Sequence, residues 1–157
     1  SYLKEIGTSI SKLNKNIYTD NIAINSVLIS KMIKDNDINI DLDIKVNSTI
    51  NMSNVDICII LGNLLDNAIE ACNLIDGYKF IDLKINTKDN KLIIKISNNT
   101  NGYVNKVNGR FITTKNSDMS GLGLTQIDNI VKEYNGYINR KYENNIFTTY
   151  LMISYED

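Results

Sequence analysis

The sequence predicts an α+β two-layer sandwich, in which a mixed sheet carries its helices on one face. Three observations indicate this fold class. The chain has 157 residues, the length of a single domain. Its helical segments are too few to alternate with every strand, which disfavours a doubly wound sheet. The longest helical segment has one broad apolar face, which must pack on a sheet.

The first half of the chain is predicted to hold two helices, a strand and a third helix. Residues 1–16 have apolar positions at helical spacing, namely Leu3, Ile6, Ile10 and Leu13. A helix is expected over about 21–35, with Val27 near its apolar stripe of Ile22, Ile29 and Ile33. Residues 38–46 alternate as in a strand, with inward positions Ile38, Ile40, Leu42, Ile44 and Val46. The third helix is expected over about 53–74.

The centre of the chain is predicted to form a hairpin followed by a long loop. Alternating runs at 79–86 and 91–97 flank Lys88-Asp89-Asn90, which suits a tight turn. Residues 98–120 are polar and aperiodic. A connection of about 23 residues is longer than ordinary loops, and such loops usually serve function or are disordered.

The last part of the chain is predicted to form a helix and a second hairpin. The helix is expected over about 122–134, and Asn135-Gly136 is a usual helix terminator. Residues 137–153 are expected to pair around Glu143-Asn144-Asn145. Together these segments supply the sheet and the helices of the predicted sandwich.

The composition excludes several classes of function. Seventeen basic and eighteen acidic residues give a net charge of -1, which disfavours binding of a nucleic-acid backbone. The chain has no His, so His-based acid–base catalysis and His-ligated metal sites are excluded. Cys58 and Cys72 would lie about 21 Å apart on one helix, too far for a disulfide. No apolar run reaches the roughly 18 residues that span a membrane.

The third helix carries polar side chains beside its apolar face. The apolar face comprises Ile57, Leu61, Leu64, Leu65, Ala68 and Cys72. Asn63 and Asn67 are four residues apart and therefore neighbours on the helix, and Glu70 lies on the same edge. An Asn oxygen can bind a hard cation such as Mg²⁺, and its amide can donate to a phosphate. Alternatively, these residues simply face solvent in an Asn-rich chain.

The last helix opens with a glycine-rich segment, Ser120-Gly121-Leu122-Gly123-Leu124. Glycines let backbone N–H groups approach an anion, and a helix start carries partial positive charge. This segment could therefore hold a phosphate, although a plain turn before a helix gives the same pattern. The preceding loop contains a segment that could fold over a polyphosphate, made of Phe111, Ile112, Thr113, Thr114 and Lys115.

These two segments resemble motifs of the GHKL ATP-binding superfamily, which includes gyrase and the histidine kinases. The run from Asn63 to Ala68, NLLDNA, resembles the N box, and Gly121–Leu124 resembles the second glycine box. The sequence around both motifs is most similar to that of sensor histidine kinases of the Agr-like, peptide-pheromone quorum-sensing group. The resemblance covers about residues 21–153.

The resemblance implies the Bergerat fold, with ATP and Mg²⁺ bound between the N-box helix and a lid. It implies that Asn67 is the Mg²⁺ ligand and that Asn63 lies next to the phosphates. The other implied nucleotide-binding residues belong to the lid and the glycine box, namely Thr114, Lys115, Gly121, Leu122, Gly123 and Leu124.

Two positions separate this chain from other members of the superfamily. Most members place an Asp in a DxGxG box, where it accepts from the adenine amino group, and here Asn98 stands roughly at that position. A neutral acceptor makes a weaker hydrogen bond, so we expect weak nucleotide affinity. Gyrase-like ATPases have a water-activating Glu one turn before the metal-binding Asn, and here that position is Asn63. The resemblance therefore implies phosphate transfer to a partner rather than ATP hydrolysis.

The sequence is thus interpreted as the ATP-binding catalytic domain of a membrane-anchored bacterial sensor histidine kinase, lying in the cytoplasm. Residues 1–16 would be a remnant of an upstream helical dimerisation domain or a linker, and residues 17–157 the catalytic domain. The phosphoacceptor His would lie on that helical domain, and a response regulator would act downstream. Two alternatives stay open: a GHKL serine kinase of the anti-sigma type, and a non-catalytic regulatory module of the same fold.

Overall fold

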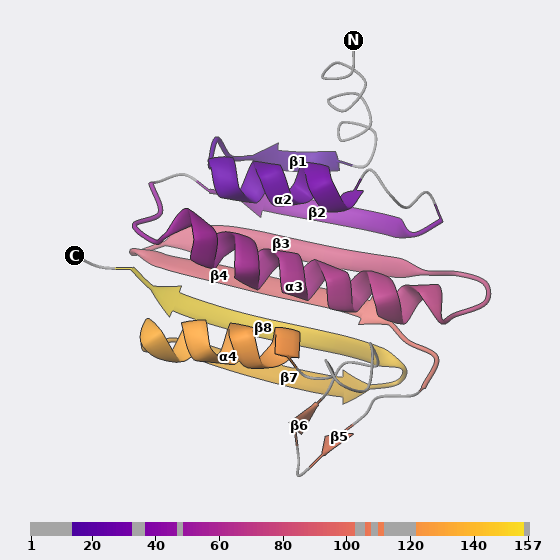
Figure 1. Cartoon of the computed structure of the whole chain (residues 1–157). Helices are drawn as coiled ribbons and strands as arrows, with labels where there is room; N and C mark the ends of the chain where they lie inside the picture. The colour runs from indigo at the N-terminus through magenta and orange to yellow at the C-terminus, as the bar shows by residue number, and fades with distance from the viewer. Residues whose placement is uncertain are drawn as a thin grey trace.

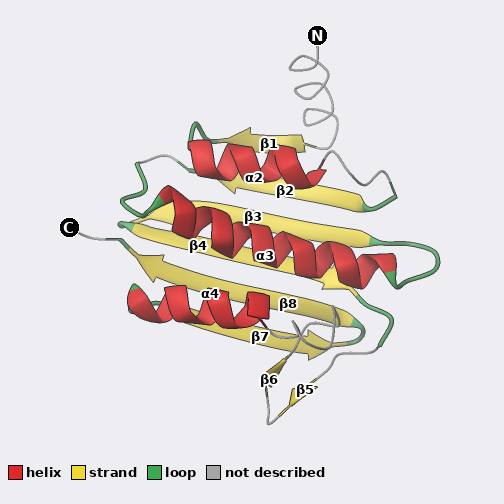
Figure 2. Ribbon diagram, in the orientation of Figure 1, coloured by secondary structure: helices red, strands yellow, loops and turns green. Residues whose placement is uncertain are grey.

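Six strands form one mixed sheet in the computed structural model, and the three described helices cover one of its faces (Figures 1 and 2). The structure describes residues 14–32, 37–46, 49–102, 106–107, 110–111 and 122–155. The strand order is β1-β2-β3-β4-β8-β7. The predicted two-layer fold with helices on one face is therefore confirmed.

The first edge of the sheet contains a strand that was not predicted. Strand β1 (Asn14–Tyr18) runs parallel to β2 (Asn39–Lys45), and helix α2 (Ile22–Met32) connects them. Residues 14–16 therefore belong to this strand and not to a helix, so the prediction for them is wrong. The strand reads NKNIY, which has too few apolar residues to show an alternating pattern. The rest of that predicted helix lies outside the described residues.

Helix α2 has a different buried stripe from the predicted one. Ile22 is 73% exposed because it is the first residue of the helix, where the Asn21 side chain accepts from the N–H of Ile24. Ile29 is only partly buried, and Ile33 lies outside the described residues. The residues that do pack inward form a wider stripe along the helix: Ala23, Ile24, Val27, Leu28 and Met32.

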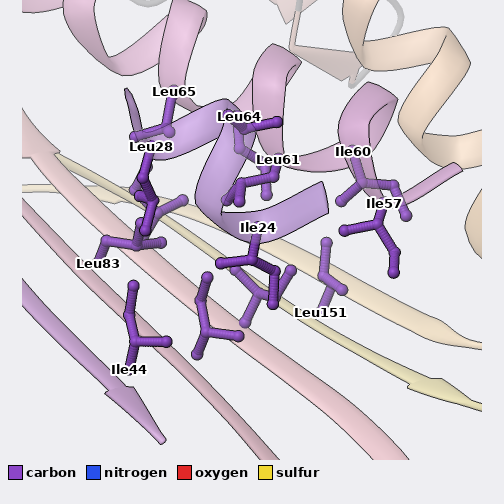
Figure 3. Packing of buried hydrophobic residues seen from close by; sticks show 14 of the residues in the cluster. Ile24, Leu28, Ile44, Ile57, Ile60, Leu61, Leu64, Leu65, Leu83 and Leu151 are labelled. Atoms are coloured by element: carbon purple, nitrogen blue, oxygen red, sulfur yellow. The ribbon is translucent and has the colours of Figure 1, made fainter. Parts of the chain in front are cut away.

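Helix α3 (Asn54–Asn73) connects β2 to the parallel strand β3 (Phe80–Lys88) and lies over the centre of the sheet. The Ser53 side chain caps its start by accepting from the N–H of Asp56 at 3.4 Å. All six predicted apolar residues of this helix are buried, together with Ile60. The five inward positions predicted for β2 and its flanks are also buried. Figure 3 shows side chains of both helices facing residues of the sheet; from the helices it labels Ile57, Ile60, Leu61, Leu64 and Leu65 of α3 with Ile24 and Leu28 of α2, and from the sheet Ile44, Leu83 and Leu151.

Strand β4 (Lys91–Asn99) pairs antiparallel with β3 through the predicted hairpin. Asp89 and Asn90 both have positive φ, at 51° and 57°, as a two-residue turn requires. The strand runs two residues further than predicted, so Asn98 lies in the sheet and not in the loop. The described parts of the following segment include two short paired strands, β5 (Lys106–Val107) and β6 (Arg110–Phe111).

The C-terminal part follows the prediction. Helix α4 (Leu122–Glu133) is followed by a turn in which Asn135 has a φ of 51°, and then by Gly136, as the predicted terminator implies. Strands β7 (Tyr137–Glu143) and β8 (Ile146–Ser154) form the second hairpin. Strand β8 pairs with β4, which places β7 at the second edge of the sheet.

The arrangement of the helices positions the candidate site. Helix α3 lies between α2 and α4 over the sheet, and the start of α4 lies beside the middle of α3 (Figure 1). The second half of α3 therefore extends beyond the start of α4. Among the described residues, no helix is long and apolar enough to cross a membrane.

Candidate functional site

Helices α3 and α4 approach closely where Asn63 meets Gly123. A Cβ atom added to Gly123 would lie 3.2 Å from Oδ1 of Asn63 and 3.4 Å from its Cγ. The Asn63 Nδ2 also donates to Oε1 of Gln126 at 3.1 Å. Gly123 and Gln126 both lie in the first turns of α4. The structure thus brings a predicted amide of α3 against the glycine-containing start of α4.

Asn67 lies one turn further along α3, on the same side as Asn63. Its amide is half-buried and has no hydrogen-bond partner among the residues that the structure describes. The adjacent Asp66 points toward α2, where its Oδ1 pairs with Nζ of Lys31 at 2.8 Å. The amide of Asn67 is therefore available to a ligand, whereas the carboxylate of Asp66 is already engaged.

A second contact joins α3 and α4 at the other end of α4. The hydroxyl of Tyr134 donates to Oδ2 of Asp56 at 2.7 Å and accepts from the N–H of Ser53 at 3.5 Å. Partial burial, and then the hydrogen bond to Asp56, raise the pKa of Tyr134 above its ordinary value of 10.0. The two contacts together fix the spacing between the helices along the length of α4.

Asn98 lies on the helix-facing side of β4 and is only 4% exposed. Its Nδ2 donates to the carbonyl oxygen of Asn99 at 3.0 Å, which leaves Oδ1 as an acceptor. The Sγ of Cys72 lies 3.8 Å from Oδ1 of Asn99, so this end of β4 sits beneath the last turns of α3. Asn98 thus occupies the same end of the molecule as the second half of α3.

Sequence reasoning did not identify Thr149 as a neighbour of Asn98. Thr149 is 3% exposed and is paired with Ile96, while Asn98 is paired with Phe147. Asn98 and Thr149 are therefore diagonal neighbours on the inner face of the sheet. The available signal was a hydroxyl at an inward position of β8, in alternation with Leu151 and Ile153.

The remaining predicted site residues are only partly described. Thr114, Lys115 and Gly121 lie outside the described residues. Leu122 is 46% exposed, and Leu124 is buried at 7%, so only its backbone is available to a ligand.

The donor groups of this site suit an anion that carries a hard cation. The first N–H groups of α4 have no partner within the helix and favour negative charge. Within the described part of the chain, no group of three His, Cys, Asp or Glu side chains could hold a metal. The oxygens of Asn63 and Asn67 fit Mg²⁺, which is usually bound by few protein oxygens together with the phosphates of a ligand. The position one turn before Asn67 is occupied by the amide of Asn63 and not by a carboxylate.

Comparisons with known proteins identify a family for this chain and structures that share its fold. A family model described as "GHKL domain" matches residues 52–154. The catalytic domain of the histidine kinase ThkA superposes with a TM-score of 0.64 at 20% identity, covering 87% of this chain and 92% of that chain. The Acinetobacter baumannii histidine kinase AdeS superposes with a TM-score of 0.61 at 17% identity, covering 99% of this chain and 78% of that chain.

A complex of ThkA with the response regulator protein TrrA gives a TM-score of 0.61 at 19% identity, covering 99% of this chain and 48% of that chain. No sequence match to a curated protein was found. At these identities the structural matches show a shared fold.

Proposed function

Because the chain belongs to the GHKL domain family, we propose that it is the ATP-binding catalytic domain of a sensor histidine kinase. The observation that carries this proposal is the contact of Asn63 with Gly123, which joins the N-box helix to the glycine-containing helix start. The reaction moves the γ-phosphoryl group of ATP to a His on a helical domain, since this chain contains no His. The kinase belongs to the Agr-like quorum-sensing group.

The triphosphate is held at the start of α4. Backbone N–H groups from Gly121 to Leu124 donate to its oxygens, and Thr114 and Lys115 close over it from the lid. Asn67 supplies an oxygen to Mg²⁺, and Asn63 lies beside the phosphates. When bound, the Mg²⁺ ion offsets the charge of the phosphate chain and orients it for transfer.

The adenine ring is bound at the end of β4. The free Oδ1 of Asn98 accepts from the exocyclic amino group, and Thr149 is the diagonal neighbour of Asn98 on the same face of the sheet. Because Asn98 is neutral, this bond is weaker than one to a carboxylate, and the nucleotide binds weakly. The orientation of Asn98 by the Asn99 carbonyl supports a role for the amide in place of the usual Asp.

The absence of a base beside the phosphates favours transfer over hydrolysis. Asn63 cannot take a proton from water, and the carboxylate of Asp66, although it lies close to Asn63 on the helix, is paired with Lys31 of α2. The acceptor is therefore a partner group, positioned by the helical phosphoacceptor domain. The residues before β1 lead to that domain, and further segments of the same protein anchor the kinase in the membrane. A response regulator receives the phosphate, in line with the solved ThkA–TrrA complex.

A calorimetric titration with a non-hydrolysable ATP analogue tests this proposal. We expect saturable binding that strengthens with Mg²⁺ and that falls at least about tenfold in Asn67→Ala, the loss of one charge-assisted ligand contact. Asn73→Ala, at the exposed end of the same helix, is the matched control and should bind as the wild type does. If no binding is seen at millimolar concentrations of the analogue, the assignment as a kinase is overturned. The non-catalytic regulatory module would then be favoured, and the neutral Asn98 is compatible with it.

A further inference from the structure

We propose that Gln126 is a positioning residue, which holds the amide of Asn63 so that its oxygen faces the cation-bearing triphosphate at the start of α4. This inference rests on the proposed function. It assigns to Gln126 a part in the binding of the metal-bound nucleotide, although Gln126 lies outside both sequence motifs.

The amide of Asn63 has both of its ends placed by α4. Its nitrogen donates to Oε1 of Gln126 at 3.1 Å. Its oxygen is the nearest atom to the open side of Gly123, 3.2 Å from an added Cβ. Gly123 and Gln126 are three residues apart, so they form one face of the helix. In the structure, one turn of α4 thus contacts both ends of the Asn63 amide.

Orientation matters because the two ends of an amide have opposite chemistry. The oxygen of Asn accepts hydrogen bonds and binds cations, whereas the nitrogen only donates. The two ends have nearly the same shape, so packing alone distinguishes them poorly. In the structure the oxygen of Gln126 accepts from the nitrogen of Asn63, which leaves the Asn63 oxygen facing the start of α4, where the metal-bearing triphosphate would lie.

Asn67 has no equivalent support. Among the described residues its amide has no hydrogen-bond partner. Its orientation is therefore determined by the ligand, whereas that of Asn63 exists before the ligand arrives. Preorganised groups cost less entropy on binding, so Gln126 should strengthen binding of the metal-bound nucleotide specifically.

The orientation can be measured in the ligand-free protein. We expect the side-chain NH₂ signals of Asn63 in a ¹⁵N–¹H spectrum to shift in Gln126→Leu, which keeps the size of the side chain and removes the acceptor. Gln126→Glu keeps an acceptor and should retain a hydrogen-bonded NH₂. Asn129→Ala, one turn further along α4, is the control and should leave these signals unchanged. Unshifted Asn63 signals in Gln126→Leu would overturn the proposal.

The consequence for binding is a change in the effect of Mg²⁺. The quantity is the ratio of the analogue's Kd without Mg²⁺ to its Kd with Mg²⁺. In Gln126→Leu this ratio should fall about threefold to tenfold, the range of one lost hydrogen bond. In Gln126→Glu the ratio should be retained, even if both Kd values rise through charge repulsion. An unchanged ratio in Gln126→Leu, with a wild type that binds the analogue, overturns the inference alone. A wild type that binds no analogue overturns the proposed function as well.

Discussion

Gly123 lacks a side chain at the point where α4 meets Asn63. A Cβ there would stand 3.2 Å from Oδ1 of Asn63, so the amide must move by a few tenths of an ångström. We expect Gly123→Ala to weaken binding of the ATP analogue about tenfold or more, because the phosphate-binding turn and Asn63 are displaced together. Calorimetric titration measures the affinity, and thermal unfolding shows that the fold persists.

Gly62 provides a matched control on α3. An added Cβ would meet only Cε of Lys31, at 4.0 Å, and the residue is in the helix interior. Gly62→Ala should therefore raise the free energy of unfolding by up to about 1 kcal/mol and leave affinity unchanged. Equal losses of affinity in the two variants would show that Gly123 has no special place in the site.

Single residues were predictable from sequence where local spacing alone carries the signal. Asn63 and Asn67 are one helical turn apart, and Gly123 lies in the first turn of a helix, so their placement follows from helix geometry. Gln126 and Thr149 were missed because their roles depend on the packing of α4 on α3 and on the register of β8 with β4. Neither relation has a local sequence signature.

The link between helices α3 and α4 at Tyr134 can be tested separately. Tyr134→Phe removes the hydroxyl that donates to Asp56 at 2.7 Å. We expect the free energy of unfolding to fall by about 1 kcal/mol, the usual net value of such a bond. Urea denaturation measures it, with Tyr137→Phe, which is 54% exposed, as the control. An equal fall in the free energy of unfolding in both variants would show that this contact has no specific role in stability.

The open face of the sheet carries an unfavourable pair of carboxylates. Asp41 and Asp82 are register partners on β2 and β3. Burial, and then the charge of Asp41, raise the pKa of Asp82 above its ordinary value of 3.8. The folded state therefore favours the protonated form, and the stability from this preference is lost as pH rises through the raised pKa.

Asp82→Asn should consequently stabilise the protein at neutral pH. We expect a gain of about 0.5 kcal/mol in the free energy of unfolding, typical of a relieved like-charge pair across strands. The gain should vanish below the ordinary pKa of 3.8, where the wild-type carboxyl is protonated in both states. Denaturation at pH 7 and at pH near 3 measures it, and Asp76→Asn in an exposed loop is the control. A gain that persists at acid pH would contradict the electrostatic explanation.

The predictability of the helices and strands depended on how strongly each pattern repeats. Strand β2 has three buried apolar side chains with one more at each flank, helix α3 has seven, and both were predicted closely. Strand β1 was missed because it has a single aliphatic residue, Ile17. The stripe of α2 was misplaced because isoleucines occur on several of its faces, and only packing on α3 selects among them.

At the scale of the whole molecule, the absence of His from this chain leads to a specific prediction about phosphorylation. The chain incubated with γ-labelled ATP should carry no stable label, because it contains no His to accept the phosphoryl group. Label should instead appear on a helical phosphoacceptor domain supplied in the same reaction. Acid treatment should release that label, as expected for phosphohistidine. Stable label on this chain would contradict the assignment and favour a kinase acting on hydroxyl groups.

The two-layer architecture could be predicted because it follows from the order of helices and strands. The insertion of β8 between β4 and β7 could not, since no local pattern determines which strands pair over long distances. This insertion brings Thr149 beside Asn98, and it places α4 over strands β7 and β8. The pairing of distant strands therefore creates the part of the site that sequence reasoning lacked.

In the proposed complex, the metal and the triphosphate lie between the middle of α3 and the start of α4. Paramagnetic broadening of backbone amide signals by Mn²⁺ with the ATP analogue locates the metal directly. We expect the strongest broadening at Asn67 and Gly123, and almost none at Tyr134 or Tyr18, which lie at the far end of α4 and in β1. Broadening confined to other regions, such as the open face of the sheet, would contradict the account.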